Sequence, residues 1–405
     1  MKFLSLWKTS DPSFRKNLLI YLASYFLVLF NYPLIRASGI TFFFEAFGAK
    51  SSPTAMFVSV FFLALTVMVC NKIQTNSAVQ KVFFLASAVS GLLFISGTLG
   101  YLSGSHFSAY IPFIWKEIYI VLQVHLLLAY GNTFFSRDEF KLLLGPIGAA
   151  GSIGGILGGL LTSYLSAEWG TSTVMWTGVF FIFLPAILFL FTRPVLAKIS
   201  EKNVSPLKSL DTPAIRRYVF YVALVVFLTQ FVINIADFMF HLEFESQITS
   251  SQERTAYLGR MYSLTNLLTL IFQVVLLPFL LPRVSEKNFH LFIPLSYAVS
   301  IALMLSGSGI GLLPIAALFT YLKAADYSLF SSGKEILYQP LKAQQKYGAK
   351  YLTDMLVYRA GKAFVALVLI YLQSSSILNM LMFIFLGIWI LLIIKLFQLH
   401  RHLFS

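Results

Sequence analysis

The sequence predicts an all-α polytopic membrane protein with about twelve transmembrane helices in two six-helix bundles. Two observations indicate this class. The chain of 405 residues is 58% hydrophobic and only 11% charged, a balance that suits lipid rather than water. Its apolar runs are long and do not alternate, so helices of about 20 residues fit them and a membrane β-barrel does not.

Twelve apolar segments account for the helices, six on either side of a polar connector. No cleavable signal peptide is expected, because the first apolar run is long enough to span the membrane. The connector is rich in Lys and Pro and predicts a first bundle over 1–192, a cytoplasmic connector over 193–217 and a second bundle over 218–405. The expected spans are 18–35, 52–70, 82–101, 109–131, 142–166, 173–192, 218–239, 257–281, 289–306, 310–330, 351–372 and 377–396.

Lys and Arg residues are concentrated in every second loop, which predicts the orientation of the chain. Basic residues accumulate on the cytoplasmic side of short loops. With the amino terminus inside, the opposite side keeps only Arg36 at a helix end, Lys50 and Arg254. We therefore expect both termini in the cytoplasm and the protein in the inner membrane. The net charge of +14 mostly reflects this orientation, so it is weak evidence for an anionic substrate.

Ionisable residues inside the expected spans are the candidate functional residues, because charge at membrane depth is costly. They recur on the first, fourth, seventh and tenth spans: Arg36; Lys116 and Glu117; Asp237; Lys323 and Asp326. Arg260 lies on the eighth span, and Arg359 and Lys362 lie on the eleventh. A period of three helices is the layout of major facilitator transporters, in which the first helix of each three-helix unit lines the central cavity.

Two of these groups also have structural interpretations. Lys323 and Asp326 share a helix face, where they could neutralise each other. Arg359 and Lys362 also share a face, but no acid lies one turn beyond them. That arrangement indicates either acids on another helix or a polyanion as the partner.

Polar residues on the fourth and seventh spans can likewise have a structural or a functional role. Lys116 and Glu117 point about 100° apart, so we do not expect one simple surface pair. Asn234, which shares a helix side with Asp237 and His241, is expected to pack helices rather than bind a ligand, because amides commonly hydrogen-bond across helices. Asp237 needs a cationic partner or a proton.

The glycine-rich run GPIGAAGSIGGILGG at 145–159 is expected to pack helices closely. It lacks the GK[ST] ending of a phosphate-binding loop and lies within an apolar span. His125 and His290 have no clustered ligands, so neither a metal nor another cofactor is expected. Cys70 is the single cysteine and excludes an internal disulfide. No cluster of nucleophile, base and orienting group predicts an enzyme.

The segment at 327–362, YSLFSSGKEILYQPLKAQQKYGAKYLTDMLVYRAGK, resembles part of the ATP/ADP translocases, the nucleotide transporters of plastids and intracellular bacteria. The resemblance extends to FNYPLIRASG at 30–39, to WKEIYIVL and GNTFFSRDEFKLLLGPIG within 115–148, and to NIADFMFH and QERTAYLG within 234–259. These blocks lie in both halves, and the one at 327–362 is the most specific.

This resemblance implies a major facilitator-like fold and exchange of nucleotides, commonly ATP for ADP. Two acids and two lysines are important for transport in that family. Glu117 matches the first acid, Asp237 replaces the second, a glutamate, and Lys362 matches the second lysine. Gly39 stands where the family has its first lysine, and we expect Arg36, nearly on the same helix face, to supply part of the missing charge.

The substrate site expected from these arguments is built mainly of charged residues. Lys362 and Arg359 would hold phosphates, and Glu117 and Asp237 would pair with the cations when no substrate is bound. The complete expected set is Lys362, Arg359, Glu117, Asp237, Arg36, Lys116, Lys323, Asp326 and Asn234. Transport would proceed by alternating access of the two bundles around a site at the midplane.

Two other hypotheses remain open at the level of the sequence. The same fold could carry another phosphorylated or anionic solute, with or without proton coupling at Asp237. A non-transporting membrane scaffold would instead use Lys342, Lys346 and Lys350 to contact anionic lipid. The expected partners are the transported anion and the lipid bilayer, without nucleic acid, and the protein is expected to be a monomer.

Overall fold

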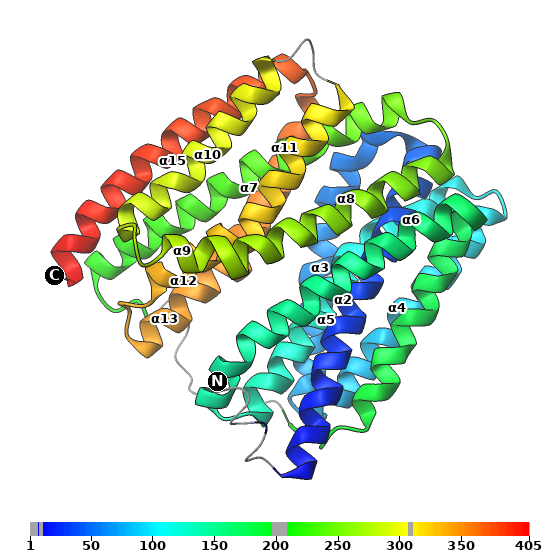
Figure 1. Ribbon diagram of the computed structural model, residues 1–405, viewed down its shortest axis with the longest axis horizontal. Helices are drawn as coiled ribbons and strands as arrows, with labels where there is room; N and C mark the ends of the chain where they lie inside the picture. The colour runs from blue at the N-terminus through cyan, green and yellow to red at the C-terminus, as the bar shows by residue number, and fades with distance from the viewer. Residues whose placement is uncertain (1–6, 8–10, 197–208, 307–310, 405) are drawn as a thin grey trace. The chain divides into compact units, whose positions relative to one another are not determined.

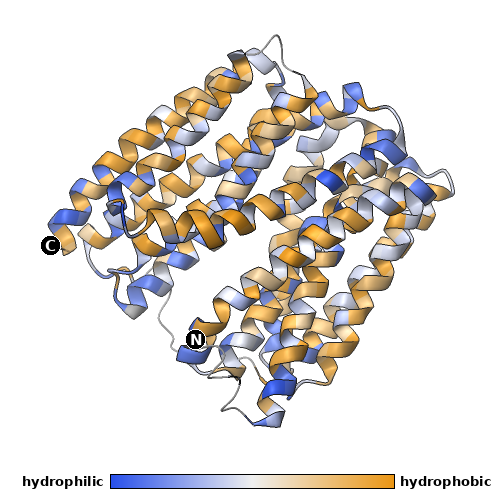
Figure 2. Cartoon of the chain, viewed as in Figure 1, coloured by the Kyte–Doolittle hydropathy of each residue, from blue (hydrophilic) through white to orange (hydrophobic). Residues whose placement is uncertain are grey.

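The computed structural model describes Trp7 and residues 11–196, 209–306 and 311–404, and these residues form helices without any β-strand (Figure 1). Among them, nine helices are long and apolar enough to cross a membrane. Hydrophobic residues dominate along the helices, and hydrophilic residues gather towards many of the helix ends (Figure 2). The all-α membrane fold predicted from the sequence is therefore confirmed.

The helices divide into two compact units, each described here by itself. Unit 1 comprises Met1–Gly48, Phe61–Ser200 and Ile248–Leu267. Its helices are α2 (Pro12–Phe47), most of α3 (Ser52–Gln74), α4 (Val79–Leu102), η2 (His106–Ala109), α5 (Tyr110–Phe134), α6 (Arg137–Leu190) and most of α8 (Ser251–Ile271).

Unit 2 comprises Ala49–Val60, Glu201–Gln247 and Leu268–Ser405. Its helices are η1 (Ala49–Ser51), α7 (Pro213–Gln247), η3 (Phe272–Leu276), α9 (Leu277–Leu280), α10 (Glu286–Ser306), α11 (Leu312–Ala325), η4 (Asp326–Phe330), α12 (Ser331–Tyr338), α13 (Ala343–Lys350), η5 (Tyr351–Val357), α14 (Tyr358–Tyr371) and α15 (Ser375–Phe404). Because α3 and α8 contribute to both units, and because 197–208 of the expected connector lies outside the described residues, the division at 193–217 stays a prediction.

The nine candidate spans and the twelve expected ones differ for identifiable reasons. The 54-residue α6 contains both 142–166 and 173–192, and it is interrupted between them at Gly170, where φ is 84°. Around 310–330 and 351–372, α-helical turns are joined to the π-helical turns η4 and η5, so α11 and α14 have only 14 residues each. The count of twelve thus stays a prediction.

Gly170 adopts a left-handed conformation that a side chain disfavours. Gly170→Ala is therefore expected to lower the free energy of unfolding by about 1–2 kcal/mol. Gly387→Ala is the matched control, because a Cβ at this helical position of α15 meets nothing within 4 Å. Thermal unfolding in detergent should separate the two variants. Equal melting temperatures would contradict the assignment of strain to Gly170.

Capping interactions define where α2 and α6 begin. The Asp11 carboxylate accepts a hydrogen bond from the Phe14 amide at 2.7 Å, and Pro12 occupies the first turn of α2, where its missing N–H costs nothing. At α6, the Ser136 amide donates to the Glu139 carboxylate at 2.7 Å, while the Glu139 amide donates to the Ser136 hydroxyl at 3.4 Å. This reciprocal capping box fixes the first turn of the longest helix.

Glycines of α6 allow backbone-to-backbone packing within unit 1. A Cβ at Gly154 or Gly158 would collide with the backbone carbonyl oxygens of Phe26 and Phe30 on α2. A Cβ at Gly159 would meet the backbone of α8 in the same way. The Ser263 hydroxyl on α8 also donates to the Ile156 carbonyl at 2.8 Å. The expectation that this run packs helices closely is confirmed.

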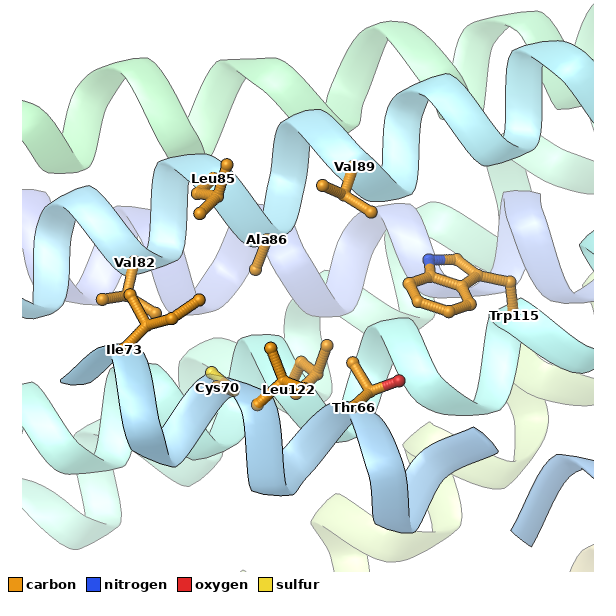
Figure 3. A pocket seen from close by; sticks show the side chains of 10 residues that line it. Thr66, Cys70, Ile73, Val82, Leu85, Ala86, Val89, Trp115 and Leu122 are labelled. Atoms are coloured by element: carbon orange, nitrogen blue, oxygen red, sulfur yellow. The ribbon is translucent and has the colours of Figure 1, made fainter. Parts of the chain in front are cut away.

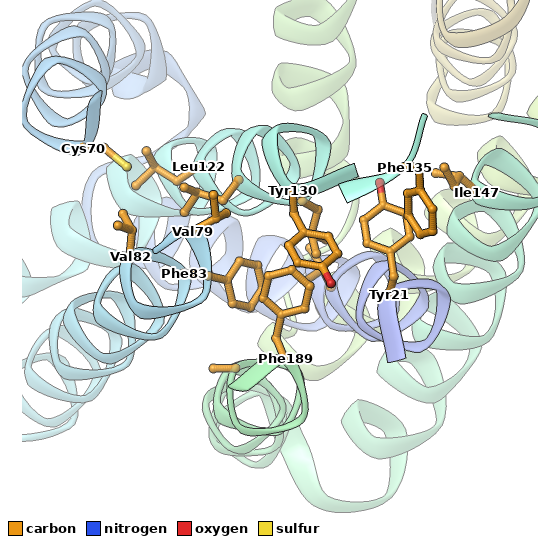
Figure 4. Packing of buried hydrophobic residues seen from close by; sticks show 14 of the residues in the cluster. Tyr21, Cys70, Val79, Val82, Phe83, Leu122, Tyr130, Phe135, Ile147 and Phe189 are labelled. Carbon is orange, nitrogen blue, oxygen red and sulfur yellow. The ribbon is translucent and has the colours of Figure 1, made fainter. Parts of the chain in front are cut away.

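Aromatic residues fill the core at one end of unit 1 (Figure 4). The ring centroids of Tyr21 and Tyr130 lie 5.9 Å apart, and Phe135 packs edge-on against Tyr21 at 5.5 Å. Phe189 from the end of α6 lies 4.8 Å from Tyr130. The Tyr130 hydroxyl donates to the Asn17 side-chain carbonyl at 3.3 Å, so this buried polar group keeps a partner. The contacts hold α2, α5 and α6 together.

Candidate functional site

Arg36 of α2 lies between aromatic rings of unit 1. Its guanidinium carbon is 4.7 Å from the ring centroid of Tyr262 on α8 and 5.6 Å from that of Tyr32. Stacking on aromatic faces stabilises a guanidinium while its N–H groups stay directed around the plane. Tyr262 was not among the residues predicted from the sequence, because nothing in the sequence pairs position 262 with position 36.

Lys116 and Glu117 of α5 lie closer together than their helical positions predicted. The Lys116 side chain bends back, and its Nζ lies 3.7 Å from the Glu117 carboxylate. Lys116 is only 4% exposed, and its Nζ donates to the Phe113 carbonyl at 2.8 Å and sits over the Phe113 ring. The contact is buried on the lysine side, so it is not the simple surface pair that the sequence argued against. The contact is loose, because 3.7 Å is longer than a hydrogen bond.

Gly39 is held against the start of α5. A Cβ at this position would lie 3.1 Å from the Pro112 carbonyl oxygen and 3.3 Å from its carbonyl carbon. Any residue larger than glycine would therefore require α2 and α5 to separate by a few tenths of an ångström. The lysine that the resemblance to ATP/ADP translocases implies at this place would need the same small shift.

The polar face of α7 is held within its own helix. The Asn234 amide nitrogen donates to the Gln230 backbone carbonyl at 2.7 Å, so the expected hydrogen bond across to another helix is wrong for Asn234. Asp237 and His241 lie one turn apart, with the carboxylate 3.8 Å from His241 Nε2. A histidine is thus one near partner of the carboxylate that the sequence predicted to need one.

Asp326 and Lys323 flank the junction of α11 and the π-helical η4. Asp326 is 7% exposed, and the charges of Lys323 and Lys334 act on its carboxylate electrostatically. Lys323 Nζ also lies 5.6 Å from the ring centroid of Tyr327. π-Helical turns disturb the ordinary hydrogen-bond ladder and occur frequently at functional sites. Here Gln273 of η3 donates to the Tyr327 carbonyl at 3.4 Å.

Arg359 and Lys362 lie on one side of α14. The helix packs on α7 through Gly361, whose Cβ would meet Phe227 and Gln230 at 3.3 and 3.5 Å. Arg359 is two residues earlier and so about 200° around the helix, facing away from that contact. Its half-buried guanidinium has no hydrogen bond or ion pair with any described residue. Lys362, three residues on, shares this side.

An ion-pair network missed by sequence reasoning joins the two helices around the 339–342 connector. Lys334 Nζ of α12 lies 2.8 Å from the Asp354 carboxylate of η5. The Tyr338 hydroxyl donates to the same oxygen at 3.2 Å, and Thr353 donates to it at 3.1 Å. A sequence separation of 20 residues hid this pair, although both residues lie within the segment that carries the family resemblance.

Asp354→Asn is expected to destabilise unit 2 by about 1–2 kcal/mol, because the Lys334 ammonium loses its charged partner. The matched control is Glu335→Gln. Its ion pair with Lys350, 2.7 Å long, is more exposed and contributes less than about 1 kcal/mol. Thermal unfolding of the purified variants compares their melting temperatures directly. A larger drop in melting temperature for Glu335→Gln than for Asp354→Asn would contradict this prediction.

Solved transporter structures share the fold of this chain. The crystal structure of nucleoside transporter NupG superimposes with a TM-score of 0.63 at 15% identity, over 95% of this chain and 99% of that chain. The POT family transporter PepTSo gives 0.67 at 13%, over 95% and 98%. A bacterial homologue of the iron transporter ferroportin gives 0.65 at 13%, over 93% and 98%. The predicted major facilitator-like fold is confirmed.

Part of the sequence matches the model of a protein family. No curated protein matches the chain. The model of the TLC ATP/ADP transporter family matches residues 289–403, which hold Lys323, Asp326, Arg359 and Lys362 of the expected site. The resemblance to ATP/ADP translocases that the 327–362 segment carried is therefore confirmed by a family match over 289–403.

Proposed function

We propose that this multi-pass membrane transporter exchanges nucleotides, ATP for ADP, by alternating access. The proposal rests on the environment of Arg359. Its guanidinium is half-buried and has no counter-ion in the described part of the chain. Arg359 also lies in the segment that matches the ATP/ADP transporter family. A planar guanidinium binds phosphate oxygens in pairs, and an anion in place would compensate a charge that is costly at membrane depth.

The other charged residues have complementary roles in this proposal. Lys362, on the same side of α14, adds a second cation for a polyphosphate, which has up to about four negative charges that need compensation. Glu117 and Asp237 compete with substrate for the cations, so that the empty and loaded states differ in their ion pairs. Arg36, Lys116, Lys323, Asp326 and Asn234 complete the proposed set.

A second candidate function is exchange of a smaller phosphorylated anion. The observation that favours it is the tight packing of Gly39 against Pro112, at the place where the resemblance to ATP/ADP translocases implies a lysine. One cation fewer lowers the electrostatic attraction for a triphosphate more than for a monophosphate. A single counter-exchange experiment separates the two candidates.

The test is uptake of radiolabelled ATP into proteoliposomes preloaded with ADP, with a sugar phosphate, with inorganic phosphate or with buffer alone. Exchange of nucleotides predicts that internal ADP accelerates uptake and that Lys362→Ala abolishes the acceleration. Acceleration by phosphate or sugar phosphate alone would favour the second candidate. Both candidates would be contradicted if the rate of ATP uptake were the same with every internal solute and unchanged in Lys362→Ala.

The proposed setting is the inner membrane, with both termini in the cytoplasm and the protein acting as a monomer. The distribution of Lys and Arg among the loops supports this orientation. Accessibility of tags placed at the two termini in intact and in permeabilised cells tests it. A tag detected without permeabilisation would contradict the proposed orientation.

A further inference from the structure

The helical stretch from Leu312 to Tyr338 in unit 2 is long enough to span the membrane and carries polar residues at its middle. Its helices α11, η4 and α12 follow one another without a break, because the residues at their junctions keep the right-handed helical conformation. The stretch is about 40 Å long, compared with about 30 Å for the hydrocarbon layer. Lys323 and Tyr327 lie on either side of its midpoint. Both residues are therefore expected near the centre of the bilayer.

The exposed side of this stretch is polar. Tyr327 is 46% exposed, and Lys323, one turn earlier, is partly exposed. Ser331, one turn after Tyr327, is exposed as well. Residues that follow one another at intervals of about one turn share a side of a helix. One side of the stretch therefore combines an ammonium, a phenol ring and a hydroxyl at the depth of the hydrocarbon layer.

Surfaces of this chain that suit hydrocarbon have a different composition. The exposed residues along α3 include Leu65 and Met68, and the shallow groove beside this helix is lined without any charged side chain (Figure 3). A lysine that faced lipid at the centre of the bilayer would be costly, because hydrocarbon cannot solvate an ammonium. The side that carries Lys323 and Tyr327 is therefore better suited to water and a polar ligand than to lipid.

Tyr327 presents an aromatic ring beside a cation on this side. Lys323 Nζ lies 5.6 Å from the ring centroid of Tyr327 and 5.8 Å from that of Phe319. Phe319 is 2% exposed and belongs to the core, whereas the ring of Tyr327 remains accessible to a ligand. The backbone of Tyr327 is held by Gln273 of η3, whose side-chain amide donates to the Tyr327 carbonyl at 3.4 Å. An accessible ring and an ammonium thus lie next to each other on one helix.

We propose that Tyr327 stacks on the base of the transported nucleotide while Lys323 attracts its phosphates. This inference rests on the proposed nucleotide exchange and names the residue that recognises the base. A cation alone would suit any anion, but an accessible ring beside it favours an anion that carries an aromatic group, because aromatic faces stack. Tyr327 would therefore distinguish a nucleotide from the smaller phosphorylated anions of the second candidate function.

The test is equilibrium binding of radiolabelled ATP to the purified protein, with tripolyphosphate, which has the phosphates but no base, as the competitor. Tyr327→Leu removes the ring and is expected to raise the Kd for ATP about tenfold, while the inhibition constant of tripolyphosphate stays unchanged. Tyr327→Phe keeps the ring and should bind ATP like the wild type. Tyr371→Leu is the matched control and should also bind like the wild type, because Tyr371 is an exposed tyrosine of the same unit outside the proposed set.

A second measurement needs no variant, so it decides the matter if Tyr327→Leu does not fold. Photolysis of the wild type with 8-azido-ATP, whose reactive group is on the base, is expected to label Tyr327 or a residue within one turn of it. Excess ATP should prevent this labelling. Labelled peptides are identified by mass spectrometry.

The outcomes separate this inference from the proposed function. An unchanged Kd for ATP in folded Tyr327→Leu, or labelling only elsewhere in the chain, overturns the role of Tyr327 even if the protein exchanges nucleotides. Weaker ATP binding by Tyr327→Leu, in a protein that shows no counter-exchange in proteoliposomes, supports the role of Tyr327 and contradicts the proposed exchange. A wild-type protein that binds no ATP contradicts both.

Discussion

Replacing Arg359 by glutamine is expected to lower nucleotide exchange at least tenfold, equivalent to ~1.4 kcal/mol of substrate binding or more. The guanidinium is half-buried, faces away from the α7 contact and has no counter-ion in the described part of the molecule. The shorter, neutral amide of glutamine cannot compensate phosphate charge. Arg359→Lys should recover only part of the activity, because an ammonium cannot make the paired hydrogen bonds of a guanidinium.

Lys395→Gln is the control for the loss of one positive charge. Lys395 lies exposed on α15 in the same unit and has no partner in the described structure. Exchange by this variant should equal that of the wild type, with both proteins reconstituted at equal density. If Arg359→Gln exchanges nucleotides at the rate of Lys395→Gln, Arg359 does not bind the substrate.

Gly158→Ala is expected to give the largest loss of stability, about 1–3 kcal/mol, from the addition of one methyl group. The added Cβ would overlap the backbone carbonyl oxygen of Phe30, and a backbone atom cannot rotate away as a side chain can. The helices α2 and α6 would have to separate along their contact. In a membrane this separation is especially costly, because helix association depends on close packing rather than on a hydrophobic driving force.

Gly151→Ala tests whether the loss of stability comes from the contact at position 158 or from replacing any glycine of α6 by alanine. Gly151 lies on the same helix and is also buried, but a Cβ there meets Leu29 and Tyr25 at 3.4 and 3.7 Å, which are ordinary contact distances. Its melting temperature in detergent should equal or exceed that of the wild type, because alanine favours the helix. A similar loss in both variants would show that the contact with Phe30 is not the cause.

The fold class followed from features that are local in sequence. Long apolar runs without alternation predict membrane helices whatever their neighbours are, and a run such as 145–159 requires close packing because glycine has no side chain to pack. The family resemblance around 327–362 was equally local, and the match over 289–403 confirms it. These signals need no knowledge of which helices are adjacent.

The contacts of the candidate site depend on geometry that the sequence does not contain. The π-helical turn η5 shifts the faces of its helix, so spacing rules for an α-helix do not reveal the contact of Asp354 with Lys334. The length of the Lys116 side chain lets it fold back to Glu117, although their Cα positions point apart. Asn234 bonds to its own helix, an alternative that residue type alone does not distinguish from a bond to a neighbour.

The contact of α2 with the glycines of α6 has a consequence for motion. Backbone atoms that touch directly have no rotamers to exchange, so the interface has no alternative packing into which it can relax and loses no side-chain entropy on forming. The contacting parts of α2 and α6 should therefore move as one rigid body during a transport cycle. Conformational change within unit 1 would then occur at contacts made by longer side chains, because these side chains can repack.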